Sequence, residues 1–402
     1  ATIIIDSSIQ WHTLEILLSS EMGLRRIVYS SLWALAGNFR IAGKNLKRGT
    51  LIYTSPLSFM IIGLGVLMAL ISGCSPSVQT YQGYLQKPKL TDRFFITSDA
   101  KKLPLNVWNS QATKVKAVVI ALHGFNDHSG AFKELGNILA DHGYLFYAYD
   151  QRGFGNTQNR GIWAGTDLLV QDLKEFVSLI KKTHPKLPIH ALGESMGGAV
   201  ILSAISKQKG MKRPKLTSAI LSAPAVWGRN TMPIWQSKIL NSLAHIIPMV
   251  KLTPQGLNIN PSDNIEMLQA LRDDPLYITE SRLDTVYGLT NLMDEALEAS
   301  SYQDTPLLIL YGAKDDLVPK SSTCKMLSKL SNGKQKQWHL AFYPNGHHLL
   351  FRDLDRDVVV RDIKAWLAFK KNPLPSGYEV VLSKVKNFDS SDCLTKSTLI
   401  YK

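Results

Sequence analysis

The 402-residue sequence predicts an α/β protein with a mostly parallel sheet flanked by helices. Short apolar runs typical of buried strands alternate with longer patterns typical of helices, at a spacing of about thirty residues. An apolar content of 45% is enough for one large core, and no internal repeat divides the chain. The alternating segments are residues 145–150, 167–182, 188–192, 197–207 and 218–222.

The most informative motif is Gly193-Glu194-Ser195-Met196-Gly197, which follows the apolar run 188–192 and opens a series of good helix formers. In such a strand–turn–helix, glycines on either side of the serine let the strand and the helix approach closely. The serine hydroxyl is then exposed beside a helix N-terminus, which favours a developing negative charge. The motif predicts Ser195 as a nucleophile on an elbow formed with Gly193 and Gly197.

A nucleophilic serine needs a base that takes its proton and an acid that orients the base. The apolar run 306–312 ends just before Asp315 and Asp316, and we favour Asp315 because it lies nearer the strand end. Asp316 remains the alternative, and both carboxylates could simply solvate a loop. The next apolar run precedes His347 and His348, of which we favour His348 as the base and His347 as its neighbour.

An oxyanion hole needs two backbone N–H groups that point at one position. The apolar run 118–122 is followed by a sharp turn that contains Gly124 and Phe125. We expect one donor at the N–H of Met196, directly after the nucleophile, and the second at the N–H of Phe125.

Five motifs in this order resemble the monoacylglycerol lipase and lysophospholipase branch of the α/β-hydrolases. The resemblance implies an eight-stranded, mostly parallel sheet with a helical lid after the sixth strand. It implies hydrolysis of lipid carboxylic esters through an acyl-enzyme, with the triad on Ser195, Asp315 and His348. The family's oxyanion donors fall on Phe125 and Met196. The motifs occupy residues 123–129, 149–155, 193–198, 312–319 and 343–348 within a similarity that spans about residues 90–372.

Two parts of these motifs have no expected catalytic role. Glu194 stands where many relatives have histidine, and we expect it to tune the chemistry. The sequence Asp150-Gln151-Arg152-Gly153 follows a strand, and we expect it to fix a loop.

More than eighty residues separate the strand that ends at Ser222 from the strand that begins near Leu307, which is long for a connection. We expect a helical lid over residues 226–304, inserted between core segments 90–225 and 305–372. Its first part, residues 231–250, has apolar side chains at near-helical spacing. That apolar face could bind an acyl chain or a bilayer, or simply cover the core. Residues 261–298 suggest further lid helix.

The N-terminal region resembles a bacterial lipoprotein signal. The thirteen apolar residues 59–71 would span about 20 Å as a helix, too short for a membrane but suitable for a signal peptide. Leu70-Ile71-Ser72-Gly73-Cys74 resembles a lipobox, so we expect Cys74 to be acylated and to anchor the protein in the cell envelope. In bacterial lipoproteins a residue other than aspartate after the cysteine favours the outer membrane, so the resemblance implies, with Ser75 at that position, a location there facing the periplasm. We expect translation to start at Leu46, with Met22 as the alternative.

These expectations divide the chain into segments. An upstream extension outside the native protein covers residues 1–45, the signal peptide residues 46–73 and a linker residues 74–89. A tail, residues 373–402, is expected to extend past the core. Cys324 and Cys393 could pair or stay free.

The sequence also indicates what the protein does not use. It has no H-E-x-x-H, no cysteines at zinc spacing and no P-loop, so we expect no metal and no cofactor. The net charge of +14 comes from scattered basic residues without a nucleic-acid motif, so attraction to a membrane surface, or simple solubility, is preferred over nucleic-acid binding. Two alternatives to an ester hydrolase remain: an acyltransferase with the same triad, and a non-catalytic membrane-anchored scaffold.

Overall fold

The computed structural model describes residues 75–110, 112–206, 213–253, 259–332, 337–369, 373–382, 388, 393–394 and 399–401. The expected upstream extension, the signal peptide and Cys74 lie outside these residues. Within the described part of the chain, none of the helices combines the length and apolar character that a membrane crossing requires.

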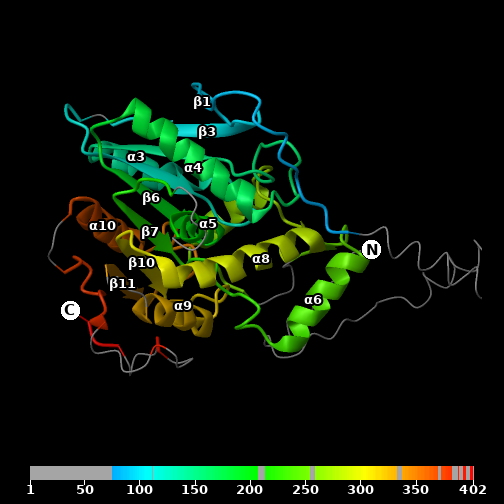
Figure 1. The fold of residues 1–402 in the computed structure, drawn as a ribbon. Helices are drawn as coiled ribbons and strands as arrows, with labels where there is room; N and C mark the ends of the chain where they lie inside the picture. The colour runs from blue at the N-terminus through cyan, green and yellow to red at the C-terminus, as the bar shows by residue number, and fades with distance from the viewer. Residues whose placement is uncertain are drawn as a thin grey trace, which may run out of the picture.

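A sheet forms the centre of the molecule (Figure 1), and it has nine strands within the described residues. Its order is β1-β2-β3-β5-β4-β6-β7-β10-β11. The last six of these strands run parallel, whereas β1, β2 and β3 are antiparallel to their neighbours. This confirms the predicted fold class, although the expected count of eight strands is wrong because a two-residue strand, β1, pairs with β2. The strands are β1 (Lys89–Leu90), β2 (Phe94–Ile96), β3 (Lys102–Trp108), β4 (Ala117–Leu122), β5 (Tyr144–Tyr149), β6 (Ile189–Glu194), β7 (Ser218–Ser222), β10 (Leu307–Gly312) and β11 (Trp338–Tyr343).

Helices cover both faces of the sheet because the buried parallel strands are apolar on both sides. In β4, Val119 packs in the cluster that includes α3 and α10, whereas Ile120 packs in the cluster that includes α4, α5, α8 and α9. The two layers therefore share the strands through their alternating side chains. The helices are α3 (Lys133–Asp141), α4 (Thr166–Thr183), α5 (Met196–Ile205), α8 (Leu283–Ala299), α9 (Lys320–Asn332) and α10 (Arg356–Leu367), with a 3₁₀ turn η1 (Ser129–Phe132) before α3.

The long segment between β7 and β10, residues 223–306, is called the insertion below. Its helix α8 packs on α5 and buries Leu292 and Ala296. Helix α6 packs against α8 at the edge of the molecule (Figure 1). Of the α6 side chains only Ala244 is buried, so this helix does not cover the core. The other insertion elements are α6 (Ile234–Ile246), β8 (Lys251–Leu252), α7 (Ile265–Asp273), β9 (Ser281–Arg282) and η2 (Ser300–Tyr302).

Part of the expected linker is hydrogen-bonded to the body of the protein. The backbone N–H of Ser77 donates to Oδ2 of Asp284 at 3.0 Å, and that of Gln79 donates to the carbonyl oxygen of Trp163 at 2.9 Å. The segment beyond Ser75 therefore binds both the insertion and the loop that precedes α4.

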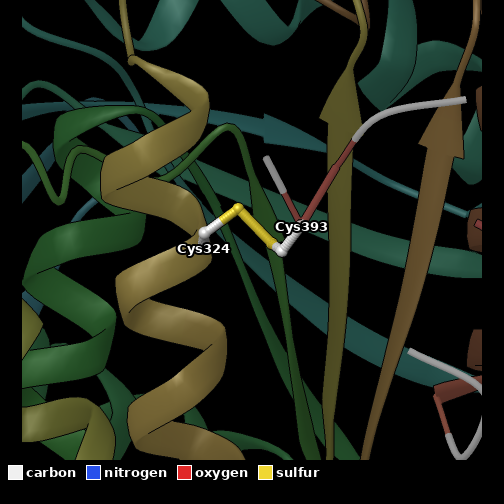
Figure 2. Close-up of a disulfide and its surroundings, with 2 residues drawn as sticks. All are labelled: Cys324 and Cys393. Atoms are coloured by element: carbon white, nitrogen blue, oxygen red, sulfur yellow. A yellow bond between two sulfur atoms is a disulfide. The ribbon is translucent and has the colours of Figure 1, made fainter. Parts of the chain in front are cut away.

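The described part of the C-terminal tail lies against the core, which corrects the expectation that it extends away. The backbone N–H of Val380 donates to the carbonyl oxygen of Leu340 at 2.8 Å, so the tail pairs with the exposed edge of β11. A disulfide joins Cys393 of the tail to Cys324 of α9 (Figure 2), and both cysteines are buried. The tail thus protects an edge strand that would otherwise be open to pairing with another chain.

A buried histidine within β6 predicts acid sensitivity. His190 is fully buried and its Nδ1 lies 2.8 Å from Oγ of Ser218, while burial lowers the pKa of His190 to about 4. Well above pH 6.5 the ring is neutral in both the folded and the unfolded protein, so it contributes no pH dependence to the free energy of unfolding. Between about pH 6.5 and 4 the unfolded chain binds a proton that the folded protein does not, so stability falls by up to about 3 kcal/mol and then levels off.

We therefore expect His190→Gln to flatten the fall in the free energy of unfolding between pH 6.5 and 4, measured by urea titration at several pH values. His245→Gln, at an exposed position of α6, is the matched control and should keep the wild-type slope. Equal slopes in wild type and His190→Gln would contradict this assignment.

Candidate active site

Ser195 occupies the sharp turn between β6 and α5. Its backbone has φ of 52° and ψ of −113°, a region that non-glycine residues rarely adopt and that costs of order 1–3 kcal/mol. Its N–H donates to the carbonyl oxygen of Ser222 at 2.9 Å, and its own carbonyl accepts from the N–H of Ala225 at 2.9 Å. Hydrogen bonds from the end of the neighbouring strand β7 thus hold the strained residue in place.

Close backbone approaches explain the two glycines of the elbow. A Cβ added to Gly193 would lie 2.5 Å from the carbonyl carbon of Gly197, and one added to Gly197 would lie 2.1 Å from the carbonyl oxygen of Leu122. Both contacts are with backbone atoms, which cannot move aside. At Gly124 an added Cβ would make an ordinary 3.5 Å contact with Cβ of Ser195, which places the turn after β4 directly against the serine.

Asp315 and His348 come together from the loops after β10 and β11. Nδ1 of His348 lies 2.9 Å from Oδ2 of Asp315. The other carboxylate oxygen accepts the backbone N–H groups of Leu317 at 2.8 Å and Val318 at 3.0 Å, which fixes the acid. Both side chains are buried. A carboxylate held in this way orients the imidazole and leaves Nε2 for another partner.

Asp316 and His347, the alternatives to Asp315 and His348, do not take part in this hydrogen bond. Asp316 is exposed to solvent. His347 is buried, but its backbone N–H donates to Oδ2 of Asp353 at 2.8 Å, and its ring faces that carboxylate. The hydrogen-bonded acid–imidazole pair therefore consists of the two favoured residues.

The pKa of His348 is raised above its ordinary value. Burial alone would lower this pKa, but the negative charge of Asp315 and its hydrogen bond to Nδ1 outweigh burial, and Glu194 adds to the same effect. A raised imidazole pKa makes this side chain a better proton acceptor.

The two expected oxyanion donors belong to the start of α5 and to the turn after β4. Met196 is the first residue of α5, so its N–H has no acceptor within the helix. Phe125 follows Gly124, at which an added Cβ would meet Cβ of Ser195, and the Phe125 ring lies edge-on to Phe154 with the ring centroids 5.5 Å apart. Asn126, the next residue, has a positive φ of 66° and accepts from the N–H of Ile278 at 2.9 Å. The turn is thereby tied to the insertion.

A buried charged group lies beside this site. Arg352 donates to Oδ2 of Asp127 at 2.8 Å and to Oε2 of Glu194 at 3.0 Å. Burial raises the pKa of Glu194, and the Arg352 guanidinium partly opposes that shift. Sequence reasoning noted Glu194 but missed its partner, because the two residues are 158 positions apart and no local pattern joins them.

The motif after β5 fixes a loop. Oδ1 of Asp150 accepts the backbone N–H of Ser129 at 2.9 Å. Arg152 is buried and binds both Asp99 and Asp172 through side-chain hydrogen bonds of 2.6 to 2.8 Å. These contacts hold the loop after β5 against η1, the turn before β3 and helix α4.

A serine on a strand–helix elbow of a parallel sheet, followed in the chain by a hydrogen-bonded acid and histidine at the ends of the next strands, defines the α/β-hydrolases. A protein-family model described as "Serine aminopeptidase, S33" (Hydrolase_4) matches residues 113–355, more than half of the chain. The chain belongs to this family and is a serine hydrolase.

Several characterised proteins are similar along most of their length. The "Monoacylglycerol lipase" of Mycolicibacterium smegmatis is 26% identical over 66% of this chain and 92% of its own length. The "Monoglyceride lipase" of Homo sapiens is 26% identical over 68% of this chain and 89% of its own length. The structure of a soluble variant of monoglyceride lipase from Saccharomyces cerevisiae, in complex with a substrate analog, has a TM-score of 0.58 at 22% identity, over 73% of this chain and 98% of that one.

Proposed function

We propose that this protein hydrolyses carboxylic esters of lipids, with monoacylglycerol or lysophospholipid as substrate, through a triad of Ser195, His348 and Asp315. The observation that carries the proposal is the 2.9 Å contact between Nδ1 of His348 and Oδ2 of Asp315, together with a strained serine on the elbow. Relatives named as monoacylglycerol and monoglyceride lipases support a lipid ester as the substrate.

The proposed reaction has two halves. Ser195 Oγ attacks the acyl carbonyl while Nε2 of His348 takes its proton, and the N–H groups of Phe125 and Met196 stabilise the oxyanion. The imidazolium, stabilised by Asp315, then protonates the departing alcohol and leaves an acyl-enzyme. Water repeats the sequence, releasing the fatty acid and regenerating the serine.

The family description names an aminopeptidase, so peptide hydrolysis is the second candidate. An aminopeptidase needs a group that binds the substrate's free ammonium. Glu194, the carboxylate next to the nucleophile, is buried and bound to Arg352, and this pairing disfavours such a role. An ester substrate needs no ammonium partner.

The test compares hydrolysis of monoacylglycerol, lysophospholipid, p-nitrophenyl esters and aminoacyl p-nitroanilides by wild type and Ser195→Ala. We expect turnover of the lipid esters by wild type alone. Turnover of only the anilides would favour the aminopeptidase, and acyl transfer to an added alcohol in preference to water would favour a transferase. No turnover of any substrate would favour the scaffold.

We further propose that the enzyme works at a membrane in an oxidising compartment of the cell envelope, anchored through acylated Cys74. Disulfides persist in oxidising compartments, and the buried bridge between Cys324 and Cys393 supports this location. Incorporation of radiolabelled palmitate into wild type but not into Cys74→Ala tests the anchor, and an unlabelled wild type would reject it.

The insertion supports a lipid surface as a partner. Ile234 of α6 is 74% exposed and Met249, just beyond α6, is 69% exposed, which makes them the two most exposed large apolar side chains among the described residues. Side chains placed in this way can enter a lipid surface and bring the site to its substrate.

Replacing Ile234 and Met249 together by serine should lower activity on lipid vesicles by at least roughly tenfold, because two apolar side chains no longer enter the lipid. Activity on a soluble short-chain ester should stay at the wild-type level. Ile400→Ser, at an exposed apolar residue of the tail, is the matched control and should change neither activity. An equal loss on both substrates would contradict a surface role.

A further inference from the structure

Three potential metal ligands meet where the insertion touches the loop that carries His348. They are Asp263 of the insertion, and His347 and Asp353 of the loop between β11 and α10. One ligand atom from each lies within 4.8 Å of the other two. Asp263 is half-buried, and the other two residues are buried.

The ring of His347 has no hydrogen-bond partner for Nδ1 among the described residues. This atom is buried, as is the residue as a whole at 8% exposure. Nδ1 points toward Oδ2 of Asp353 at 3.7 Å, beyond hydrogen-bonding distance. A buried ring nitrogen that lacks a hydrogen-bond partner and faces a carboxylate, with a second carboxylate in the same cluster, is the arrangement expected of a ligand for a bound cation.

Hydrogen bonds already orient the two carboxylates. Oδ1 of Asp353 accepts the hydroxyl of Ser262 at 2.6 Å, and Oδ2 accepts the backbone N–H of His347 at 2.8 Å. Oδ1 of Asp263 accepts the backbone N–H of Leu354 at 2.9 Å. Each oxygen keeps a second lone pair, and such outer contacts commonly fix the ligands of metal sites.

We propose that Asp263, His347 and Asp353 form a binding site for a divalent transition-metal ion such as Zn²⁺. An imidazole nitrogen with two carboxylates suits zinc and its neighbours, whereas calcium and magnesium prefer oxygen ligands alone. Ligands on zinc at about 2.1 Å lie roughly 3.4 Å from one another, so binding needs only a small contraction of the cluster. The ion's two positive charges would neutralise the two carboxylates.

Metal binding at this site would fasten the insertion to the His348 loop. The two segments already touch, since the N–H of Leu349 donates to the carbonyl oxygen of Pro261 at 2.9 Å and Nδ2 of Asn264 donates to the carbonyl oxygen of Arg352 at 3.0 Å. An ion shared between the segments would hold the insertion in register with the loop that carries the proposed base. Binding itself does not depend on the proposed function.

The experiment is a calorimetric titration of Zn²⁺ into the full chain after removal of metal with EDTA and return to chelator-free buffer. We expect one saturable site per chain, and a rise in the thermal unfolding midpoint when Zn²⁺ is present. Asp263→Asn keeps an acceptor for Leu354 but loses the ligand charge, and His347→Gln removes the ring nitrogen. Each should weaken binding by at least about tenfold and abolish the rise in midpoint.

Asp355→Asn is the matched control, because it removes a carboxylate of the same loop that is exposed and outside the cluster. It should bind Zn²⁺ as wild type does. The proposal is overturned by the absence of saturable binding to wild type, or by saturable binding that either Asp263→Asn or His347→Gln leaves unchanged. Unfolding midpoints measured without metal identify any variant that fails to fold. If His347→Gln fails to fold, Asp263→Asn remains the decisive variant, because its side chain still accepts the hydrogen bond from Leu354.

Discussion

Asp315→Asn is expected to lower kcat on a soluble p-nitrophenyl ester by about 10⁴-fold. The amide cannot stabilise the imidazolium, and as a donor toward Nδ1 it favours the wrong tautomer of His348. In the structure, one carboxylate oxygen of Asp315 lies 2.9 Å from Nδ1 of His348, and the other accepts two backbone N–H groups, so the acid is fixed against the imidazole. Asp316→Asn is the matched control, because this neighbouring carboxylate is exposed.

The pH dependence of this variant adds a second readout. In wild type, kcat/KM should fall as the pH drops through the pKa of His348, which Asp315 holds above the ordinary value of 6.5 despite burial. In Asp315→Asn no carboxylate charge opposes the effect of burial, so the pKa of His348 should fall. The acid limb of the residual activity should therefore move to lower pH. Full activity in Asp315→Asn, or a larger loss in Asp316→Asn, would contradict the assignment of the acid.

Replacing Cys324 and Cys393 together by serine is expected to lower the free energy of unfolding by about 4 kcal/mol, as estimated from the chain entropy of the unfolded loop. The bridge closes a loop between positions 69 residues apart, and it fastens the tail to α9 (Figure 2). The tail also pairs with β11 through Val380, so its release would open a sheet edge. Chemical denaturation under oxidising conditions measures the difference.

A reductant provides an internal check on the disulfide. It should bring wild type to the stability of the double variant and leave the double variant unchanged. Cys74→Ser keeps both bridged cysteines and should unfold as wild type does. A double variant as stable as oxidised wild type, with no effect of reductant on either, would show that the bridge does not stabilise the protein.

The motifs that could be predicted from sequence each follow an apolar strand directly. Ser195, Asp315 and His348 stand just past three buried runs, and parallel strands bring their carboxyl ends to one edge of the sheet. The elbow glycines could be predicted for the same reason, since a serine turn between a strand and a helix leaves no room for a side chain. Local pattern and sheet topology were enough for this part of the site.

The features that could not be predicted depend on contacts between distant segments. The pairing of Glu194 with Arg352 and the cluster of Asp263 with Asp353 have no spacing that a local pattern reveals. The tail has the proline, glycine and serine content of a loose end, yet Val380 packs in the core because the edge of β11 offers it hydrogen bonds. The ninth strand was missed because two residues are too few for a periodic signal.

The central claim is that Ser195 is the nucleophile of a covalent mechanism. The most direct measurement is mass spectrometry of the protein after reaction with a fluorophosphonate, on wild type and on Ser195→Ala. The account predicts one adduct per wild-type chain, located on the peptide that contains Ser195, and none on the variant. An unmodified wild type, or an adduct on another residue that persists in Ser195→Ala, would contradict it.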